Sequence, residues 1–321
     1  MNFPVFDLHC DTALGLLNRE FRVDKDLKSN SLHIDLERAS KLAGYCQCFA
    51  CFTTPWEKLP EGLTVYDVFE RELNAILLQI QQNPDKIRQV FSPEDIRENL
   101  DQGIMSGILT IEGPAGFGFD PALLEMLYTV GFRMSTLGWN EHNVLTGSHK
   151  TGGGLTDMGR EYVREAQRLG MLVDVSHISD EGFWDIMEIT QAPIVASHSN
   201  SRAVCDHSRN LTDDMFRAIC QTGGVAGFNQ CAPFVGSKPD LDTVCDHIFH
   251  FLELDPTGEH IALGADLDGC DELPEGFDGI QSYPAMAQRL LERGAGEEIV
   301  RNIYWNNAMG VMEHAVRHHK K

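Results

Sequence analysis

The stretch V-F-D-L-H-C-D-T, residues 5–12, joins a short apolar run to polar side chains that can bind a metal ion. Asp7, His9 and Asp11 occupy alternate positions, and residues two apart point to the same face of an extended strand. His9 and Asp11 can therefore aim an imidazole nitrogen and a carboxylate oxygen at one point, as a divalent cation requires at the end of a strand. The alternative is a strand with a merely polar end. Matching ligands elsewhere in the chain would distinguish a metal site from that alternative.

Short apolar runs alternate with longer amphipathic stretches along the whole chain. The runs predict strands over 4–8, 44–52, 107–111, 132–137, 171–175, 193–196, 223–228 and 260–264. The amphipathic patterns predict helices over 65–82, 93–102, 121–130, 157–169, 179–189, 212–221, 241–252, 283–293, 296–304 and 307–317. Near-continuous apolar strands followed by helices are typical of a parallel sheet covered on both faces. Eight such units predict an α/β fold that closes into a (β/α)8 TIM barrel with elaborated loops and C-terminal helices.

Length and composition limit the possibilities further. The chain has 321 residues, which suits one barrel with insertions, and no linker or repeat divides it, so we expect residues 1–321 to form a single domain. The formal net charge is −22. This charge disfavours nucleic acid and an anionic membrane surface as partners, because both require a basic patch.

The chain also lacks the marks of a membrane or secreted protein. No apolar stretch approaches the ~18 residues that span a bilayer. The first residues, M-N-F-P, show neither the basic nor the apolar region of a secretory signal. Nine cysteines, an odd number, are scattered through predicted strands and helices, which suits reduced thiols. We therefore expect a cytoplasmic protein.

Polar and ionisable side chains follow the predicted strands at the end where a TIM barrel carries its active site. Burying so many ionisable groups at one barrel mouth is costly unless a metal ion neutralises them. The sequence therefore predicts a metal site there. The residues that follow the strands are His9 and Asp11; Glu112; Trp139, Asn140 and His142; His177; His198; Asn229; and Asp266.

The types of ligand indicate the metal. Imidazole and carboxylate without thiolate suit zinc, with manganese, cobalt or iron as alternatives. Five candidate ligands are too many for one open catalytic zinc, so we expect two ions per chain. A carboxylate such as Glu112 can bridge two ions ~3.5–4 Å apart, the spacing of two-metal hydrolases. The five candidates are His9, Asp11, Glu112, His177 and His198.

Several longer stretches resemble a known family. They read F-D-L-H-C-D from residue 6, I-E-G from 111, G-G-L-T-D-M-G-R-E-Y-V-R-E from 153, L-G-M-L-V-D-V-S-H-I-S from 169, A-S-H-S-N-S-R-A-V-C-D-H-S-R-N-L-T-D-D from 196, G-A-D-L-D-G from 264 and L-P-E-G-F-D-G-I-Q-S-Y-P from 273. Over nearly its whole length the chain resembles the membrane dipeptidase (renal dipeptidase) family of zinc metallopeptidases, which are barrels of the amidohydrolase, metal-dependent hydrolase type.

The resemblance implies a role for each candidate residue. One zinc would be held by His9, Asp11 and Glu112, and the second by Glu112, His177 and His198. Arg209 matches the arginine that binds substrate, and Asp266 matches the acid–base carboxylate at the end of the last strand. These assignments fall on residues already chosen from their positions after strands, apart from Arg209.

One position departs from the family. Its mammalian members carry a histidine that contacts substrate after the fourth strand, in an L-T-H context. Here L-G-W-N-E-H-N places Trp139 at that position, and the sequence leaves open whether His142, three residues on, replaces the histidine. We expect Trp139, His142 and Asn229 to contact the substrate together with Arg209.

The leading hypothesis is a dinuclear zinc dipeptidase that cleaves dipeptides with a free C-terminal carboxylate through attack of a metal-bound hydroxide. Asp266 would carry the proton from the nucleophile to the leaving amine, and Arg209 would pair with the substrate carboxylate. The alternative is another amidohydrolase-type metal hydrolase acting on an amide, lactone or deamination substrate, because fold and metals do not fix the substrate. A non-catalytic relic barrel is a third hypothesis. A symmetric homodimer is the base-rate expectation for the assembly.

Overall fold

The computed structural model describes residues 3–53, 59–117 and 121–319. All eight predicted strands are present. They are β1 (Val5–Cys10), β2 (Tyr45–Phe52), β4 (Met105–Glu112), β5 (Phe132–Thr136), β6 (Leu172–Asp174), β7 (Ile194–Ala196), β8 (Val225–Phe228) and β9 (Ile261–Leu263). The sequence did not predict β3 (Ile87–Gln89), whose residues I-R-Q do not form an apolar run.

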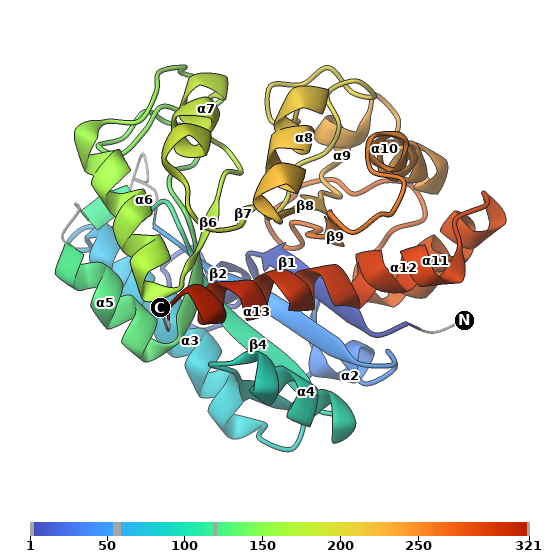
Figure 1. Cartoon of the computed structure of the whole chain (residues 1–321). Coiled ribbons are helices and arrows are strands. Elements are labelled where there is room, and N and C mark those ends of the chain that lie inside the picture. Colours follow the sequence, from blue (N-terminus) through green and yellow to red (C-terminus); the bar gives the residue numbers. More distant parts are fainter. Residues whose placement is uncertain (1–2, 54–58, 118–120, 320–321) are drawn as a thin grey trace.

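The strands form one parallel sheet that closes on itself. Their order in the described chain is β2-β1-β9-β8-β7-β6-β5-β4-β3, and β2 also pairs with β4 from Cys46 opposite Ser106 to Phe52 opposite Glu112. β3 pairs with the first residues of β4, ahead of those that pair with β5, so the ring itself consists of the other strands. Helices surround this ring (Figure 1). The predicted TIM barrel is therefore confirmed.

The predicted helices are also present. They are α3 (Val65–Gln82), α4 (Pro93–Asp101), α5 (Pro121–Val130), α6 (Asp157–Leu169), α7 (Asp180–Ile189), α8 (Asp213–Thr222), α10 (Leu241–Leu254), α11 (Tyr283–Glu292), α12 (Glu297–Arg301) and α13 (Asn307–His319). Side chains that cap the backbone define several starts: Ser92 and Thr212 each accept from the amide three residues on. The one-turn helices α1 (Thr12–Gly15), α2 (Leu36–Ala39) and α9 (Ala232–Val235) were not predicted.

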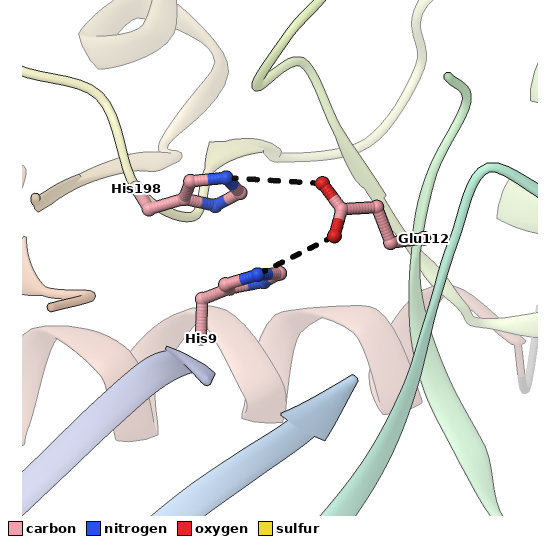
Figure 2. Close-up of side chains that lie close together, drawn as sticks. All are labelled: His9, Glu112 and His198. Atoms are coloured by element: carbon pink, nitrogen blue, oxygen red, sulfur yellow. Dashed lines mark ion pairs between the residues drawn. The ribbon is translucent and has the colours of Figure 1, made fainter. Parts of the chain in front are cut away.

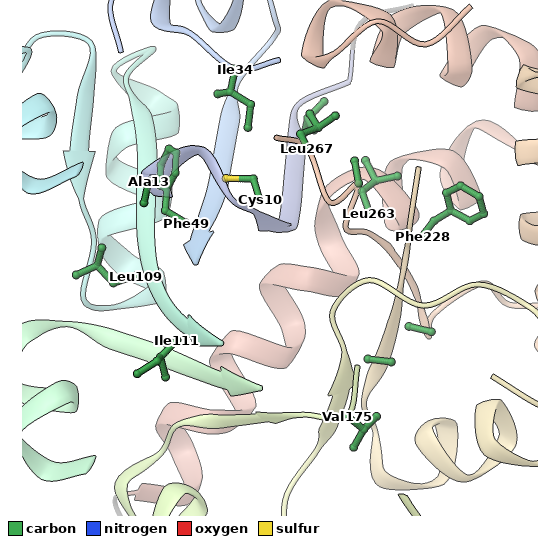
Figure 3. Packing of buried hydrophobic residues seen from close by; sticks show 14 of the residues in the cluster. Cys10, Ala13, Ile34, Phe49, Leu109, Ile111, Val175, Phe228, Leu263 and Leu267 are labelled. Carbon is green, nitrogen blue, oxygen red and sulfur yellow. The ribbon is translucent and has the colours of Figure 1, made fainter. Parts of the chain in front are cut away.

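Two apolar layers hold the barrel together. The outer layer lies between the strands and the helices, and Figure 3 shows part of it, with Phe49 on β2, Leu109 on β4 and Phe228 on β8. The inner layer fills the barrel with residues such as Phe6 and Leu8 and continues into α13. α13 contacts β1, β8 and β9 and crosses the barrel as the red helix of Figure 1.

The inner layer closes one end of the barrel. Trp305, just before α13, packs its ring against that of Phe6 near the start of β1, with centroids 5.7 Å apart. An apolar plug therefore closes the barrel at the amino ends of the strands. The polar side chains lie at the opposite end. Among the residues described, no helix combines the length and the apolar character that a membrane span requires.

Candidate active site

The five predicted metal ligands and Asp266 come together at the carboxyl ends of the strands. His9 belongs to β1, Glu112 is the last residue of β4, and the other four follow β1, β6, β7 and β9. All six side chains are buried. We call His9, Asp11, Glu112, His177 and His198 the ligand cluster.

His9 and Asp11 do not reach this place by simple alternation along one strand. β1 ends at Cys10, and Asp11 is the residue that precedes the first turn of α1. The register of β1 against β2 shifts between Asp7 and Cys10. Both side chains therefore meet through an irregular strand end followed by a turn, and the expectation of one continuous strand was wrong for Asp11.

Glu112 turns a different oxygen to each half of the ligand cluster. Its Oε2 lies 3.6 Å from His9 Nε2, while its Oε1 lies 3.1 Å from His177 Nε2 and 4.0 Å from His198 Nε2. Figure 2 shows the carboxylate between His9 and His198. On the first side, His9 Nε2 is also 3.5 Å from Asp11 Oδ2. The single carboxylate thus faces two groups of donors.

The donors fit divalent cations. His9 Nε2, Asp11 Oδ1 and Glu112 Oε1 are buried and have no hydrogen-bond partner in the described part of the chain. Buried polar atoms in native proteins are normally satisfied, so such convergent exceptions need a reason. Imidazole and carboxylate atoms within 4.8 Å of one another, as in the group of His9, Glu112 and His198, supply what zinc and similar ions bind.

Electrostatics point the same way. Burial lowers the pKa of His9, but the carboxylates of Glu112, Asp11 and Asp266 outweigh it and raise that pKa to about 10. The carboxylates therefore draw a positive charge to the point between them. Burial lowers the pKa of His177 well below its usual range, which leaves its ring neutral and able to donate a lone pair.

Buried neighbours orient the ligand cluster from behind. Asp7 accepts from the His9 amide at 2.9 Å and from the Ala265 amide, which ties the end of β1 to the end of β9. Ser197 Oγ lies 2.6 Å from His198 Nδ1, so the Nε2 atom of that ring is directed into the site. Such outer contacts commonly fix the ring orientation of metal-binding histidines.

Two of the key residues have strained backbones. His177 has φ 70° and Asp266 has φ 59°, in the left-handed region that non-glycine residues seldom adopt. Strain of this kind costs about 1–3 kcal/mol per residue and collects at functional sites.

The Asp266 side chain is positioned by Asn229, whose Nδ2 donates to Asp266 Oδ2 at 3.1 Å. The other oxygen of Asp266, Oδ1, lies 3.8 Å from His9 Nε2.

A cavity of about 290 Å³ opens over the ligand cluster. Trp139 lies at its edge, with its ring edge-to-face against Phe52 at a centroid distance of 5.2 Å. We call Trp139, Cys231, Phe234 and Asp268, which follow the strands on loops or, for Phe234, on the one-turn helix α9, the rim. The full lining is Asp11, Leu14, Phe52, Glu112, Trp139, Asn140, His177, Cys231, Phe234, Asp266, Asp268 and Gly269.

His142 is not part of this lining. Its side chain is exposed and lies near Gly153. Asn140 lines the cavity instead, with Oδ1 3.3 Å from His177 Nδ1 and 2.8 Å from His149 Nε2. The polar group nearest to Trp139 in sequence that faces the cavity is therefore an amide.

Arg209 is buried beside His198, one of the ligand cluster. Its Nη2 donates to the His198 carbonyl at 3.1 Å and its Nη1 to Ser199 Oγ at 3.2 Å, while Nε has no partner in the described chain. The guanidinium also lies over the Phe234 ring, 5.5 Å from its centroid. Arg209 is therefore an interior residue and not part of the surface.

The sequence did not identify Cys231, Phe234 or Phe52, and it offered Asp268 only as the nearest substitute for Asp266. Asp268 accepts from Thr12 Oγ1 at 2.6 Å and from the His33 amide at 2.7 Å, so it holds two distant segments beside the cavity.

Burial, and then the neighbouring Cys231 thiol, raises the pKa of the Cys270 thiol well above its usual range. The D-L-D-G motif contained a signal for Asp268, but nothing in the sequence placed the two cysteines together.

Comparisons with known proteins agree with this geometry. A family model for membrane dipeptidases (peptidase family M19) matches residues 1–321. An uncharacterized dipeptidase of Schizosaccharomyces pombe is 35% identical over 214 residues, 64% of this chain and 52% of that protein, so the match spans about half of that relative.

Two solved structures are similar over the whole barrel. A metallopeptidase from Rhodobacter sphaeroides, bound to a phosphinate mimic of the dipeptide L-Ala-D-Ala, has a TM-score of 0.87 and 27% identity, covering 98% of this chain and 100% of that one. A dipeptidase of family M19 has a TM-score of 0.86 and 28% identity, covering 98% of this chain and 99% of that one.

Proposed function

The chain belongs to the membrane dipeptidase family and is by that membership a metal-dependent dipeptidase, and we propose that it uses two zinc ions to cleave dipeptides with a free C-terminal carboxylate. One observation carries the proposal of two ions. The buried Glu112 carboxylate presents Oε2 to His9 and Oε1 to His177 and His198. A carboxylate used in this way is typical of two-metal hydrolase sites.

The ligand cluster divides between the ions. His9, Asp11 and Glu112 would hold one, and Glu112, His177 and His198 the other. When bound, the ions supply Lewis acidity and make water a nucleophile at neutral pH. Asp266 lies close to the first group, since its carboxylate and the ligand atoms of His9 and Asp11 are all within 4.8 Å of one another.

Asp266 is the proposed proton carrier. Burial raises the pKa of its carboxyl, against the opposing charge of His9, and a carboxyl held beside the ligand cluster is placed to take and give a proton. Asn229 Nδ2 binds its Oδ2, which leaves Oδ1 directed to the ligand cluster. We assign to it the transfer of a proton from the attacking water to the leaving amine.

Arg209 is proposed to bind the substrate carboxylate. The guanidinium is fixed by His198 and Ser199, and its buried Nε has no partner in the described chain, although Arg209 itself is not part of the cavity lining. A buried arginine without a carboxylate partner suits a ligand that carries its own negative charge. The dipeptide mimic bound to the Rhodobacter sphaeroides relative is the same class of ligand.

Trp139 and Phe52 are proposed to contact the substrate side chains. Their edge-to-face pair forms an apolar part of the cavity wall near the ligand cluster. The proposed dipeptides are accordingly compact or apolar. His142, which is exposed and outside the lining, is proposed to have no direct role.

A substrate panel with metal analysis tests the proposal. Purified chain should hold close to two zinc ions, and hydrolysis of L,L- and L,D-dipeptides should stop when a chelator removes them and return with zinc. Dipeptide C-terminal amides should be poor substrates. A chain that holds one ion at zinc saturation would contradict the dinuclear site, and preferred cleavage of amides or lactones would favour the alternative amidohydrolase function.

The cytoplasmic location and the homodimer remain predictions. In support of the first, all nine cysteines are free thiols. Fractionation of the source cells and light scattering of the pure protein test the two separately.

A further inference from the structure

Two thiols lie beside Asp266, and the proposed reaction uses neither. Cys231 follows β8 and lines the cavity, while Cys270 follows β9 and is buried. Their sulfur atoms and a carboxylate oxygen of Asp266 all lie within 4.8 Å of one another. Residues from two different loops thus bring three potential ligand atoms to one point in the cavity wall.

The arrangement is held by named contacts. Asn229 Nδ2 donates to Asp266 Oδ2 at 3.1 Å, and Asn229 Oδ1 accepts from the Cys231 amide at 2.5 Å. The side chain of Asn229 therefore ties the loop that carries Cys231 to the carboxylate. Hydrogen bonds within the protein therefore set the position of Cys231 relative to Asp266.

The donor set selects a class of ligand. Two thiolates with one carboxylate form a softer set than the imidazoles and carboxylates of the ligand cluster, and soft donors favour thiophilic cations. An ion about 2.3 Å from each sulfur allows sulfur atoms to lie up to about 4.6 Å apart. Both thiols are free, and their sulfur atoms lie within 4.8 Å of each other, close enough for one cation to contact both.

The surroundings attract positive charge. Two carboxylates outside the ligand cluster, those of Asp266 and Asp268, line the same cavity, and the chain as a whole carries a formal net charge of −22. A cation that enters the cavity after the ligand cluster is filled therefore still meets an acidic wall. Cys231 is the thiol that it meets there, because Cys231 is part of the lining.

We propose that Cys231, Cys270 and Asp266 form an inhibitory site for an additional thiophilic divalent cation, such as Cd²⁺ or zinc in excess of the two ions of the ligand cluster. Binding releases the two thiol protons to solvent and forms two metal–thiolate bonds and one metal–carboxylate bond, with no change of oxidation state. The bound cation occupies the carboxylate of Asp266, which then cannot carry the proton of the hydrolytic reaction. The inhibitory effect rests on the proposed function, whereas cation binding by the thiols does not.

The test is a cadmium titration of the zinc-loaded chain. Thiolate-to-cadmium charge-transfer absorption in the ultraviolet reports only ions bound by sulfur, and dipeptide hydrolysis is followed in the same samples. The absorption should saturate at one cadmium per chain. The rate should fall in parallel by roughly a hundredfold or more, the worth of an acid–base group, and a dithiol chelator should restore both.

Three variants locate the site. Cys231→Ser and Cys270→Ser should each lose the absorption and the inhibition, with every rate compared with that variant's own cadmium-free rate. Either variant suffices if the other does not fold, since each removes one thiolate. Cys220→Ser is the matched control and should behave as wild type. It is an informative control because Cys220 lies within 4.8 Å of Asp255 and His260, a second group with a thiol.

Four results would overturn the inference. Loss of the absorption in Cys220→Ser alone would move the cadmium to the group with Asp255 and His260. Inhibition without thiolate absorption, equal in all variants, would mean exchange of cadmium into the ligand cluster. A Cys231–Cys270 disulfide in the unreduced protein, found by mass spectrometry, would replace the cation site. Thiolate absorption without a fall in the rate would show that the bound cation does not inhibit hydrolysis. If the zinc-loaded chain hydrolysed no dipeptide at all, the proposed function would fail, while the absorption and its loss in the variants would still support the cation site.

Discussion

The ligand cluster and the rim face each other across the barrel mouth but are built differently. Every member of the ligand cluster is buried and lies on a strand or within a few residues of one, and Asp7 and Ser197 hold His9 and His198 from behind. The rim is only partly buried, and Trp139 is 36% exposed. The barrel thus encloses the metal-binding side chains, whereas part of the substrate-facing wall is open to solvent.

The comparison predicts a gradient of effects. Changes in the ligand cluster should abolish activity towards every substrate, because they remove the ions themselves. Changes further out should affect one step, one substrate group or only the order of preferred substrates. Four variants follow this gradient from the largest expected effect to the smallest.

Glu112→Gln should lose both ions. A neutral amide is a poor replacement for a carboxylate that serves two groups of ligands, and metal Lewis acidity is worth several kcal/mol, so kcat/KM should fall by roughly four orders of magnitude or more. Elemental analysis and dipeptide hydrolysis measure this. Glu72→Gln is the matched control: Glu72 is also a buried glutamate, but its Oε2 accepts from the Phe52 amide, and the variant should keep both ions. Retention of one ion by Glu112→Gln would show that Glu112 serves a single metal.

Asp266→Asn should keep the ions and the fold but lose turnover. The amide has the shape of the carboxyl but cannot carry a proton at neutral pH, and such a group contributes ~10²–10⁴-fold to the rate. Metal content and kcat are measured together. Asp268→Asn is the comparison, because Asp268 lines the same cavity but bonds to Thr12 and His33. If Asp268→Asn proved the slower enzyme, the acid–base role would belong to Asp268.

Arg209→Met should remove the preference for a free carboxylate. A charge-assisted hydrogen bond is worth ~1.5–3 kcal/mol, so kcat/KM for a dipeptide should fall roughly ten- to a hundredfold, while that for its C-terminal amide should change little. Arg202→Met is the matched control, since Arg202 lies in the same loop and pairs with Asp180. Equal cleavage of acid and amide by wild type would exclude Arg209 from carboxylate binding.

Trp139→His should change only the order of preferred dipeptides, by a few-fold in relative kcat/KM. It replaces an apolar ring of the rim with a smaller hydrogen-bonding ring, and binding differences of ~1–3 kcal/mol separate similar side chains in a pocket. The control is Trp184→His, because Trp184 is 45% exposed and lies outside the cavity lining. An unchanged order in Trp139→His would mean that Trp139 does not contact the substrate.

Most of the fold could be predicted because its signals are local. The capped amphipathic helices span enough residues to show a helical period, as in α3, and the strands stand out as apolar runs, as in β2. β3 reads I-R-Q and has no apolar run, and α1, α2 and α9 are single turns too short to show a helical period, so these elements were missed. The candidate ligands could be placed because a TIM barrel gathers the carboxyl ends of all its strands at one mouth, wherever they lie in the sequence.

The sequence by itself determined the barrel and most of the side chains at its mouth, because apolar runs and the residues that end them are properties of neighbouring residues. Only the tertiary structure decided how those side chains meet. It turned one oxygen of Glu112 to His9 and the other to His177, left His142 outside the cavity, and set Cys231 beside Cys270. These relations depend on loop paths and side-chain rotamers, which are set by packing between segments far apart in the chain and leave no periodic trace in the sequence.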